Sequence, residues 1–316
     1  MTTHTFESNG HIGVVGGGSI GVAFAILFAS SHPVRLYEPD PSRRTELTGE
    51  IAERFVTMQS FDLLNDEIET LMHRVIVSDD LGFVVNGASL VQECIPEKIE
   101  LKRTLFTQLA KLTSQDCVIA SSSSFIPTGE SAKETGVESR ALVAHPGNPP
   151  YAIPVIELVP NRATDRDVLQ RANELYVSAG MSPVVVEQEI EGFVFNRLQG
   201  AVLREAYALV RDGVASVEDI DTVMRDGLGR RWSFMGPFET IDLNTRGGLA
   251  SHAEKMGPSY HRMGLERGDT SEWTPALVAE VVRQRRQRLP IEQWQQRVNW
   301  RDEQLLRRAQ RAKKSN

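Results

Sequence analysis

A histidine and a glutamate twelve residues apart could form an acid/base pair. His145 ends the apolar stretch Ala141–His145, and Glu157 lies inside the next one, Val155–Val159. Between them, Pro146–Pro150 is too rich in proline to continue a strand, so the chain can turn back there and bring the carboxylate to the imidazole. A carboxylate beside a histidine fixes its tautomer and stabilises the imidazolium that forms when it accepts a proton. A buried histidine that simply hydrogen-bonds to a neighbour fits the same spacing.

A glycine-rich segment near the amino terminus could bind a dinucleotide. It follows the apolar run His11–Val15, opens a helix-compatible stretch and satisfies the pattern G-x-G-x-x-G with Gly16, Gly17, Gly18, Ser19, Ile20 and Gly21. In that context the first glycine permits a tight turn, the second lets the backbone approach a pyrophosphate, and the third allows close helix packing. The free N–H groups at the helix start then face the phosphates. A purely structural glycine turn is the alternative.

An acidic residue after the second predicted strand bears on which nicotinamide cofactor binds. Glu38 follows Gly21 by 17 residues, where a carboxylate accepts hydrogen bonds from both ribose hydroxyls and repels a 2′-phosphate. Arg43 and Arg44 come soon after, and they would hold that phosphate if the cofactor were NADP. Because the acid stands at the strand end, we expect NAD.

Polar residues also follow the fourth and fifth predicted strands, at the edge where open α/β sheets bind ligands. Glu97 and Lys102 come after the fourth strand, and a run of four serines, Ser121–Ser124, comes at the end of the fifth. An ordinary charged helix start would explain the first pair, and turn chemistry would explain the serines. By position, one serine hydroxyl could equally face a substrate.

The elements that must position these residues alternate along the first part of the chain. Short runs rich in Val, Ile and Leu predict strands that are buried on both faces, at His11–Val15, Pro33–Tyr37, Val75–Val77, Leu90–Cys94, Val118–Ser121, Ala141–His145, Val155–Val159 and Pro183–Val186. Helix-compatible stretches separate them, at Ile20–Ser30, Ser42–His73, Glu97–Lys111 and Asp165–Ala179. This alternation predicts an α/β fold with a doubly wound, Rossmann-type sheet.

From Gly192 onward the pattern changes to helices alone. We expect them at Phe193–Arg211, Val217–Asp226, Phe238–Lys255 and Ile291–Ala312. The sequence therefore predicts a Rossmann domain over residues 1–190, which carries His145, followed by an all-helical domain over residues 191–316.

The charge of the chain is unevenly distributed. Its last segment, Arg283–Asn316, holds eleven basic and three acidic residues for a net +8, whereas the remaining residues hold 24 basic and 39 acidic ones for a net −15. An acidic body with an ample apolar core argues against nucleic-acid binding and against disorder. In the basic tail, Trp294, Val298, Leu305 and Ala309 recur at helical spacing, which predicts a packed helix with a solvated basic face.

Cysteine content and hydropathy bear on the compartment. Cys94 and Cys117 are the only cysteines, with no second Cys or His at metal-ligand spacing, so a disulfide framework or zinc site is not expected. The apolar stretch Ile12–Ala29 approaches the length of a membrane span, but its five glycines argue against one. We therefore expect a cytoplasmic protein with no membrane segment.

Taken together, these motifs resemble the 3-hydroxyacyl-CoA dehydrogenase family, and within it most closely the lambda-crystallin/L-gulonate 3-dehydrogenase branch. The resemblance covers nearly the whole chain, through residues 93–102, 144–160, 192–199, 236–244 and 300–303. It implies an NAD-dependent oxidation of a 3-hydroxyl without a metal, in which His145 takes the hydroxyl proton and Glu157 is its partner. It further implies substrate-side roles for Ser124 and Asn196.

The same resemblance assigns residues to the cofactor and to the assembly. Glu97, Lys102, Ser124 and Asn148 fall on cofactor-contacting positions, although the serine run leaves Ser123 as the alternative to Ser124. A homodimer formed through the helical domain is the implied assembly. A lens-crystallin branch also leaves open a structural NAD-binding protein without turnover.

The substrate is less sharply indicated. Acyl-CoA members contact CoA through a helical arm after the second strand, often with Ser and Lys, whereas here Ser42–His73 has no Lys and seven acids. Arg231, or its neighbour Arg230, could instead bind the carboxylate of a small L-3-hydroxy acid in a bidentate pair. An arginine that packs at a dimer interface is the alternative. L-gulonate or a similar sugar acid is our first expectation, followed by L-carnitine and then a short-chain 3-hydroxyacyl-CoA.

Overall fold

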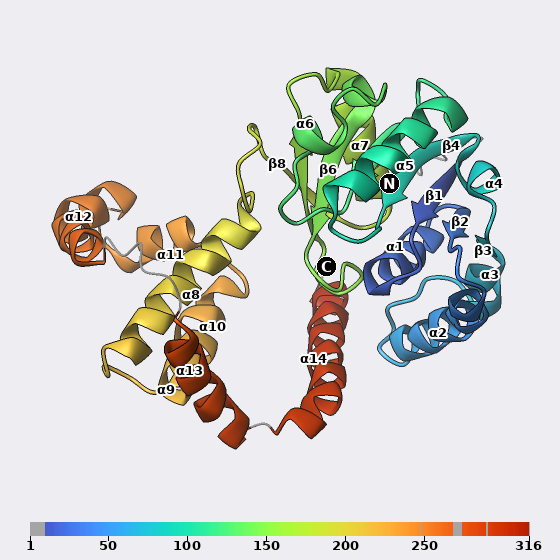
Figure 1. Ribbon diagram of the computed structural model, residues 1–316. Coiled ribbons are helices and arrows are strands. Elements are labelled where there is room, and N and C mark those ends of the chain that lie inside the picture. Colours follow the sequence, from blue (N-terminus) through green and yellow to red (C-terminus); the bar gives the residue numbers. More distant parts are fainter. Residues whose placement is uncertain (1–9, 247, 268–273, 289, 316) are drawn as a thin grey trace. The chain divides into compact units, whose positions relative to one another are not determined.

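The computed structural model describes residues 10–246, 248–267, 274–288 and 290–315 (Figure 1). Contacts divide the chain into two compact units. Met1–Arg197 and Val298–Asn316 form the first unit, and Leu198–Arg297 form the second.

The first unit is built on one eight-stranded sheet. Its strands are β1 (His11–Val15), β2 (Val34–Tyr37), β3 (Val75–Ser78), β4 (Ala88–Glu93), β5 (Val118–Ser121), β6 (Ala141–Pro146), β7 (Val155–Pro160) and β8 (Ser182–Val185). They lie in the order β3-β2-β1-β4-β5-β6-β7-β8. All neighbours are parallel except β6 and β7, which run antiparallel. The strand order therefore reverses between β1 and β4, and a crevice for a ligand is expected at that point.

Helices cover both faces of this sheet. They are α1 (Ser19–Ala29), α2 (Pro41–Gln59), α3 (Ile68–His73), α4 (Leu81–Val85), α5 (Ile99–Leu112), α6 (Thr128–Ser131) and α7 (Arg166–Ser178). Alternate strand residues point to opposite sides, so Ile12 and Val14 pack in one buried cluster with α1, α2 and α7, whereas Val15 packs in another with α4 and α5. The predicted Rossmann-type α/β fold is confirmed.

The second unit is helical. It contains most of α8 (Phe195–Arg211), then α9 (Val217–Thr222), a π-helical turn (Val223–Leu228), α10 (Gly229–Trp232), α11 (Pro237–Asn244), α12 (Gly248–Glu266) and α13 (Pro275–Arg288). The last helix, α14 (Trp294–Ser315), returns the chain to the first unit. There, Leu306 is buried and the Arg307 guanidinium lies 5.5 Å from the ring centroid of Phe61.

Several predicted helices are wrong in extent. The stretch Ser42–His73 is two helices, because the chain leaves helical geometry after Gln59 and Asp62 adopts φ 55°. Likewise, Phe238–Lys255 is broken before Gly248, whose φ of 72° suits glycine, and α12 then continues through Pro258. The helix α13 was not predicted.

The basic tail and the apolar amino-terminal stretch have clear places in the structure. Among the side chains of α14 that the structure describes, Leu306 is the most buried, and it lies next to Leu305, which was predicted to pack. The predicted Trp294 and Val298 fall outside the described side chains. The stretch Ile12–Ala29 forms β1, the glycine turn and α1 inside the core. In the described part of the chain, no helix combines the length and apolarity needed to cross a membrane.

Candidate active site

His145 and Glu157 are direct neighbours across two strands. They pair in the antiparallel register of β6 and β7, and His145 Nδ1 lies 2.8 Å from Glu157 Oε2. Both side chains are buried, at 7% and 4% exposure. The rings of Phe193 and Phe195 pack against the imidazole, with centroids 5.7 and 6.1 Å away. The expected turn after His145 therefore brings base and carboxylate together.

The second oxygen of Glu157 meets the start of α8. Its Oε1 accepts hydrogen bonds from the backbone N–H groups of Val194 at 2.8 Å and Phe195 at 2.9 Å. These groups have no acceptor within the helix, because no carbonyl group lies one turn before the first N–H groups of a helix. The turn that presents them contains two residues with positive φ, Gly192 at 76° and Phe193 at 47°.

These contacts define the protonation of the pair. Burial alone would raise the pKa of Glu157, but the hydrogen bonds from His145, Phe195 and Val194 outweigh it and hold that pKa below its ordinary value. The carboxylate is therefore ionised at neutral pH and can only accept hydrogen bonds. In the neutral histidine, Nδ1 must carry the proton, and Nε2 is left with a lone pair that can accept one from a substrate.

The glycine turn after β1 is shaped to approach a phosphate. Gly16 has φ 113°, and a Cβ on it would lie 2.7 Å from the carbonyl oxygen of Cys94. A Cβ on Gly21 would lie 1.8 Å from the Gly16 carbonyl oxygen, so α1 can start this close to the turn only with glycine there. Gly18 and Ser19 are exposed, and no side chain caps the helix start. Free N–H groups at an open helix end fit the pyrophosphate of a dinucleotide.

Glu38 is held at the end of β2 beside this turn. Its Oε2 accepts the Gly17 N–H at 2.9 Å, and its Oε1 accepts the Asp40 N–H at 3.0 Å. The two arginines that could have bound a 2′-phosphate lie beside the turn but are already paired: Arg43 with Glu46, Glu50 and the Gly17 carbonyl, and Arg44 with Asp79 and the Glu38 carbonyl. A carboxylate fixed at this point fits the ribose of NAD.

Ser124 and Asn196 are brought together near the histidine. Asn196 Nδ2 lies 3.4 Å from the Ser124 carbonyl oxygen, and it follows Phe195, whose ring contacts His145. Ser123 is buried with its hydroxyl bonded to Glu97. No hydrogen bond to the Ser124 hydroxyl is formed by any residue that the structure describes, so Ser124 rather than Ser123 has a hydroxyl available to a substrate.

Glu97 and Lys102 both form hydrogen bonds with other groups of the protein. Glu97 Oε1 accepts the N–H groups of Phe125 and Ile126, both at 3.1 Å, and thereby orders the segment that carries Ser124. Lys102 is fully buried, and its Nζ lies 2.8 Å from both carboxylate oxygens of Glu93. In this arrangement the structure does not expose Lys102 to a cofactor.

Glu93 was missed as a member of the site. It ends β4, is itself fully buried and also accepts the hydroxyl of Ser121, its register partner on β5, at 2.5 Å. The sequence offered one signal, an acid at the end of a predicted buried strand, which must be paired if it is buried, but the sequence did not identify Lys102 as its partner.

The remaining predicted residues lie on separate segments. Asn148 is exposed in the loop after β6. Arg231 lies on α10 in the second unit, half-buried, and its guanidinium forms no hydrogen bond or ion pair with the residues described. Its neighbour Arg230 is exposed, and Asp226 on the preceding turn is paired with Arg225 instead.

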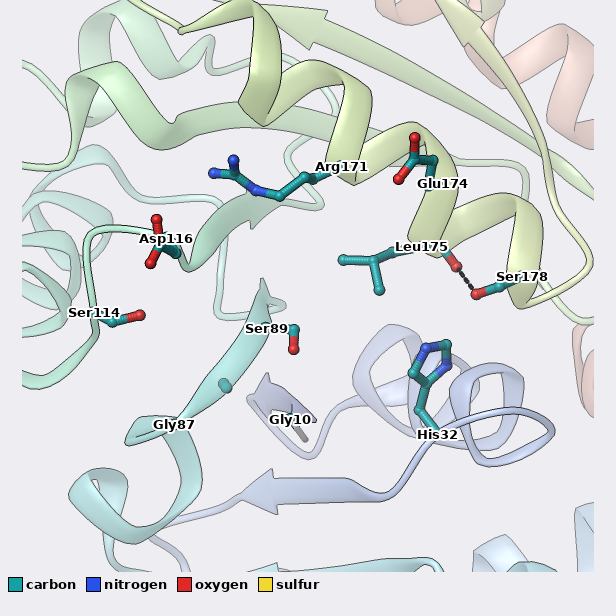
Figure 2. Close-up of a pocket in the computed structure, with 11 residues that line it drawn as sticks. Gly10, His32, Gly87, Ser89, Ser114, Asp116, Arg171, Glu174, Leu175 and Ser178 are labelled. Carbon is teal, nitrogen blue, oxygen red and sulfur yellow. Dashed lines mark hydrogen bonds between the residues drawn. The ribbon is translucent and has the colours of Figure 1, made fainter. Parts of the chain in front are cut away.

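A further cavity, of about 390 Å³, lies at the amino ends of β1 and β4, opposite the strand ends that carry the candidate site. Figure 2 shows it between Gly10, Gly87 and Ser89, near the amino ends of β1 and β4, and Arg171 of α7. None of the predicted site residues lines it. The catalytic candidates instead gather where parallel strands end, as is usual for this fold.

A dinucleotide turn and a histidine–carboxylate pair at one sheet edge together define a nicotinamide-dependent dehydrogenase that acts on an alcohol. Family comparison sharpens this class. The chain belongs to the 3-hydroxyacyl-CoA dehydrogenase family of NAD-dependent oxidoreductases: the family's NAD binding domain matches residues 11–190, and its C-terminal domain matches residues 192–287.

Individual relatives agree with this assignment. A lambda-crystallin homolog from Bos taurus is 38% identical over 315 residues, which is 98% of each chain. An L-carnitine dehydrogenase from Streptomyces griseus is 35% identical over 274 residues, 86% of this chain and 78% of the relative. Among solved structures, a 5-formyl-3-hydroxy-2-methylpyridine 4-carboxylic acid 5-dehydrogenase superposes with a TM-score of 0.74 at 28% identity, covering 84% of this chain and 83% of that one.

Proposed function

We propose that this dehydrogenase oxidises the 3-hydroxyl of a small, free L-3-hydroxy acid, with L-gulonate or a similar sugar acid as the first candidate. The observation that carries the acid/base assignment is the buried His145–Glu157 pair, in which the carboxylate contacts Nδ1 and leaves Nε2 to the substrate. The proposed domains are a cofactor domain over residues 1–190 and a helical substrate and dimerisation domain over residues 191–316, whose last segment, from Val298, belongs to the compact unit of the sheet.

The chain's own groups have distinct tasks in this proposal. Nε2 of His145 takes the proton of the 3-hydroxyl, and the adjacent Glu157 charge stabilises the imidazolium that results. Ser124 and Asn196 orient the reacting oxygen and stabilise its developing charge. NAD, when bound, supplies the acceptor for the hydride from C3. The turn from Gly16 to Gly21, together with Glu38, Glu97 and Asn148, would hold it, and Lys102 would act through the network around Glu93.

Charges on α2 favour a small acid over CoA. Its three arginines are neutralised, since Arg43 and Arg54 share Glu50 and Arg44 pairs with Asp79. The helix has as many acids, Glu46, Glu50 and Glu53, as arginines, and a surface whose cations are already paired is poorly suited to the phosphates of CoA. A free hydroxy acid needs only one cation.

Arg231 is the cation that we assign to the substrate carboxylate. It is half-buried and has no hydrogen-bond or ion-pair partner among the described side chains, whereas Arg230 is exposed. Replacing Arg231 with Met should raise the KM of the hydroxy acid about 10- to 100-fold and change kcat little, because a charge-assisted hydrogen bond common to ground and transition states is lost. Arg230→Met is the matched control and should leave KM unchanged. An unchanged KM in Arg231→Met would remove this assignment.

L-carnitine is the second candidate substrate, favoured by the 35% identity to an L-carnitine dehydrogenase. NADH formation should be compared on L-gulonate, L-carnitine, L-3-hydroxybutyrate and 3-hydroxybutyryl-CoA, with NAD and NADP. Turnover of the CoA ester alone would sink the free-acid proposal. Absence of any turnover, despite NAD binding, would favour a structural NAD-binding protein.

We also propose a cytoplasmic homodimer formed through the helical domain. Phe234, Phe238 and Leu243 around α11 are 73%, 74% and 68% exposed, an apolar surface that a second copy could cover. Both cysteines are free thiols, which suits a reducing compartment. Sedimentation equilibrium would distinguish a dimer from a monomer, and a monomer at micromolar concentration would contradict the proposal.

A further inference from the structure

The residues that hold Glu157 in place lie on the turn before α8, between the cofactor sheet and the helical part of the chain. We propose that Gly192 and Phe193 are positioning residues: their turn fixes the two backbone N–H groups that orient the Glu157 carboxylate on His145. The inference deepens the proposed function and rests on it, because it concerns how the acid/base pair is assembled.

The carboxylate is held from two sides by groups that form no other hydrogen bond with the residues that the structure describes. Oε2 meets His145 Nδ1 at 2.8 Å, and Oε1 meets the N–H groups of Val194 and Phe195 at 2.8 and 2.9 Å. Glu157 is 3% exposed, so water does not replace these donors readily. With both N–H groups on one oxygen, only the other oxygen can face the histidine.

This arrangement depends on backbone geometry that few residues adopt. Gly192 has φ 76° and Phe193 has φ 47°, and a left-handed conformation is unfavourable for a residue with a side chain by about 1 kcal/mol. Packing compensates for it. Phe193 is fully buried in a cluster with Val143, Val159 and Val186, and its ring lies against the imidazole. The aromatic side chain thus anchors the turn to the strands that carry the pair.

Other charged groups near the pair are engaged elsewhere. Glu189 accepts the Gly129 N–H at 2.8 Å, and Arg197 on α8 donates to the Glu191 carbonyl at 3.4 Å. Phe193 itself packs against Val143, Val159 and Val186. Burial disfavours the ionised form of Glu157, and the hydrogen bonds from the imidazole and from the two N–H groups favour it.

Gly192→Ala tests the proposal, because a side chain at φ 76° strains the turn while the nearest atom to its Cβ, Asn196 Cβ at 3.4 Å, is not a severe clash. Moving the two N–H groups away from Glu157 removes hydrogen bonds that stabilise its ionised form, so the pKa of the pair should rise. We expect kcat to fall about 10- to 100-fold and the acidic limb of its pH profile to rise by about one unit. The Kd for NAD should stay unchanged.

Gly180→Ala is the matched control. Gly180 has φ 84°, and its Cβ would meet nothing within 4 Å, so the substitution introduces similar backbone strain at the end of α7, away from the pair. It should move neither kcat nor the acidic limb. If Gly192→Ala behaves like Gly180→Ala, or lowers kcat without moving the limb, the turn has no positioning role and the proposal is overturned.

Two further measurements need no substrate, so they separate this inference from the proposed function. In protein labelled with ¹³C at glutamate Cδ, the Glu157 resonance, identified by its loss in Glu157→Gln, should titrate at higher pH in Gly192→Ala. An unchanged midpoint would overturn the proposal. In the wild-type protein, the Val194 and Phe195 amides should be protected from hydrogen exchange and should lose this protection in Glu157→Ala. Fast exchange in the wild type would overturn it equally, even if Gly192→Ala failed to fold.

Discussion

Replacing Glu157 with Gln should inactivate the enzyme by reversing the histidine tautomer. The change keeps the shape of the side chain, but only one end of an amide can accept hydrogen bonds. Two N–H groups, from Val194 and Phe195, already point at the position of Oε1 at 2.8 and 2.9 Å. The amide oxygen must therefore lie there, which turns the NH₂ group towards His145. Nδ1 then has to accept, the proton moves to Nε2, and the base can no longer take the hydroxyl proton.

The size of this effect follows from the alternative arrangement. Restoring the productive tautomer would turn the NH₂ group towards the two backbone N–H groups and leave both buried without an acceptor. At about 1–3 kcal/mol for each unsatisfied group, the productive form is disfavoured by about 2–6 kcal/mol, or roughly 30- to 2 × 10⁴-fold. We expect kcat, measured as NADH formation at saturating substrate, to fall within that range, with the Kd for NAD unchanged.

A second carboxylate provides the control for this substitution. Glu189 is also partly buried and also accepts a backbone N–H, from Gly129 at 2.8 Å, but it does not contact His145. Glu189→Gln should keep wild-type kcat. If Glu157→Gln retained kcat within about threefold of the wild type, the tautomer argument would be refuted.

Three other substitutions test the framework of the site. Gly21→Ala should lower the free energy of unfolding by about 3 kcal/mol or more in urea denaturation, because its Cβ would lie 1.8 Å from the Gly16 carbonyl oxygen. Lys102→Met should lower it by about 3–5 kcal/mol, because Glu93 is left as a buried, uncompensated charge. Glu38→Gln should reduce the preference for NAD over NADP about tenfold in kcat/KM, because the repulsion of a 2′-phosphate is removed.

Each of these three substitutions has a control variant or a result that would contradict it. Gly18→Ala meets nothing within 4 Å, so it should preserve the unfolding free energy while weakening NAD binding; equal destabilisation by Gly18→Ala and Gly21→Ala would refute the packing argument. Lys98→Met, at the exposed start of the same helix, should leave stability unchanged. Cofactor preference unaltered in Glu38→Gln would show that the carboxylate does not select NAD.

The sheet and the His145–Glu157 pair could be predicted because both follow from local pattern. Apolar runs of four to six residues mark buried strands. A short proline-rich turn between two such runs brings the second strand back beside the first in the antiparallel direction. The resulting antiparallel register of β6 and β7 places residues 145 and 157 opposite each other. Spacing along the sequence was therefore sufficient to pair them.

Contacts that depend on distant packing could not be predicted in this way. The N–H groups of Val194 and Phe195 reach Glu157 across 37 and 38 residues, and only the folded turn at Gly192 directs them there. Similarly, Glu93 becomes the partner of Lys102 because α5 lies against the end of β4. In the isolated sequence, that lysine resembles any other in a charged first turn.

The central claim is that His145 is the acid/base of an NAD-dependent oxidation. The most direct test is NADH formation from L-gulonate by the wild-type protein and by His145→Gln, with NAD binding measured for both. We predict turnover by the wild type, a loss of about 10²- to 10⁴-fold in the variant and equal NAD affinity in the two. Full activity in His145→Gln would contradict the mechanism.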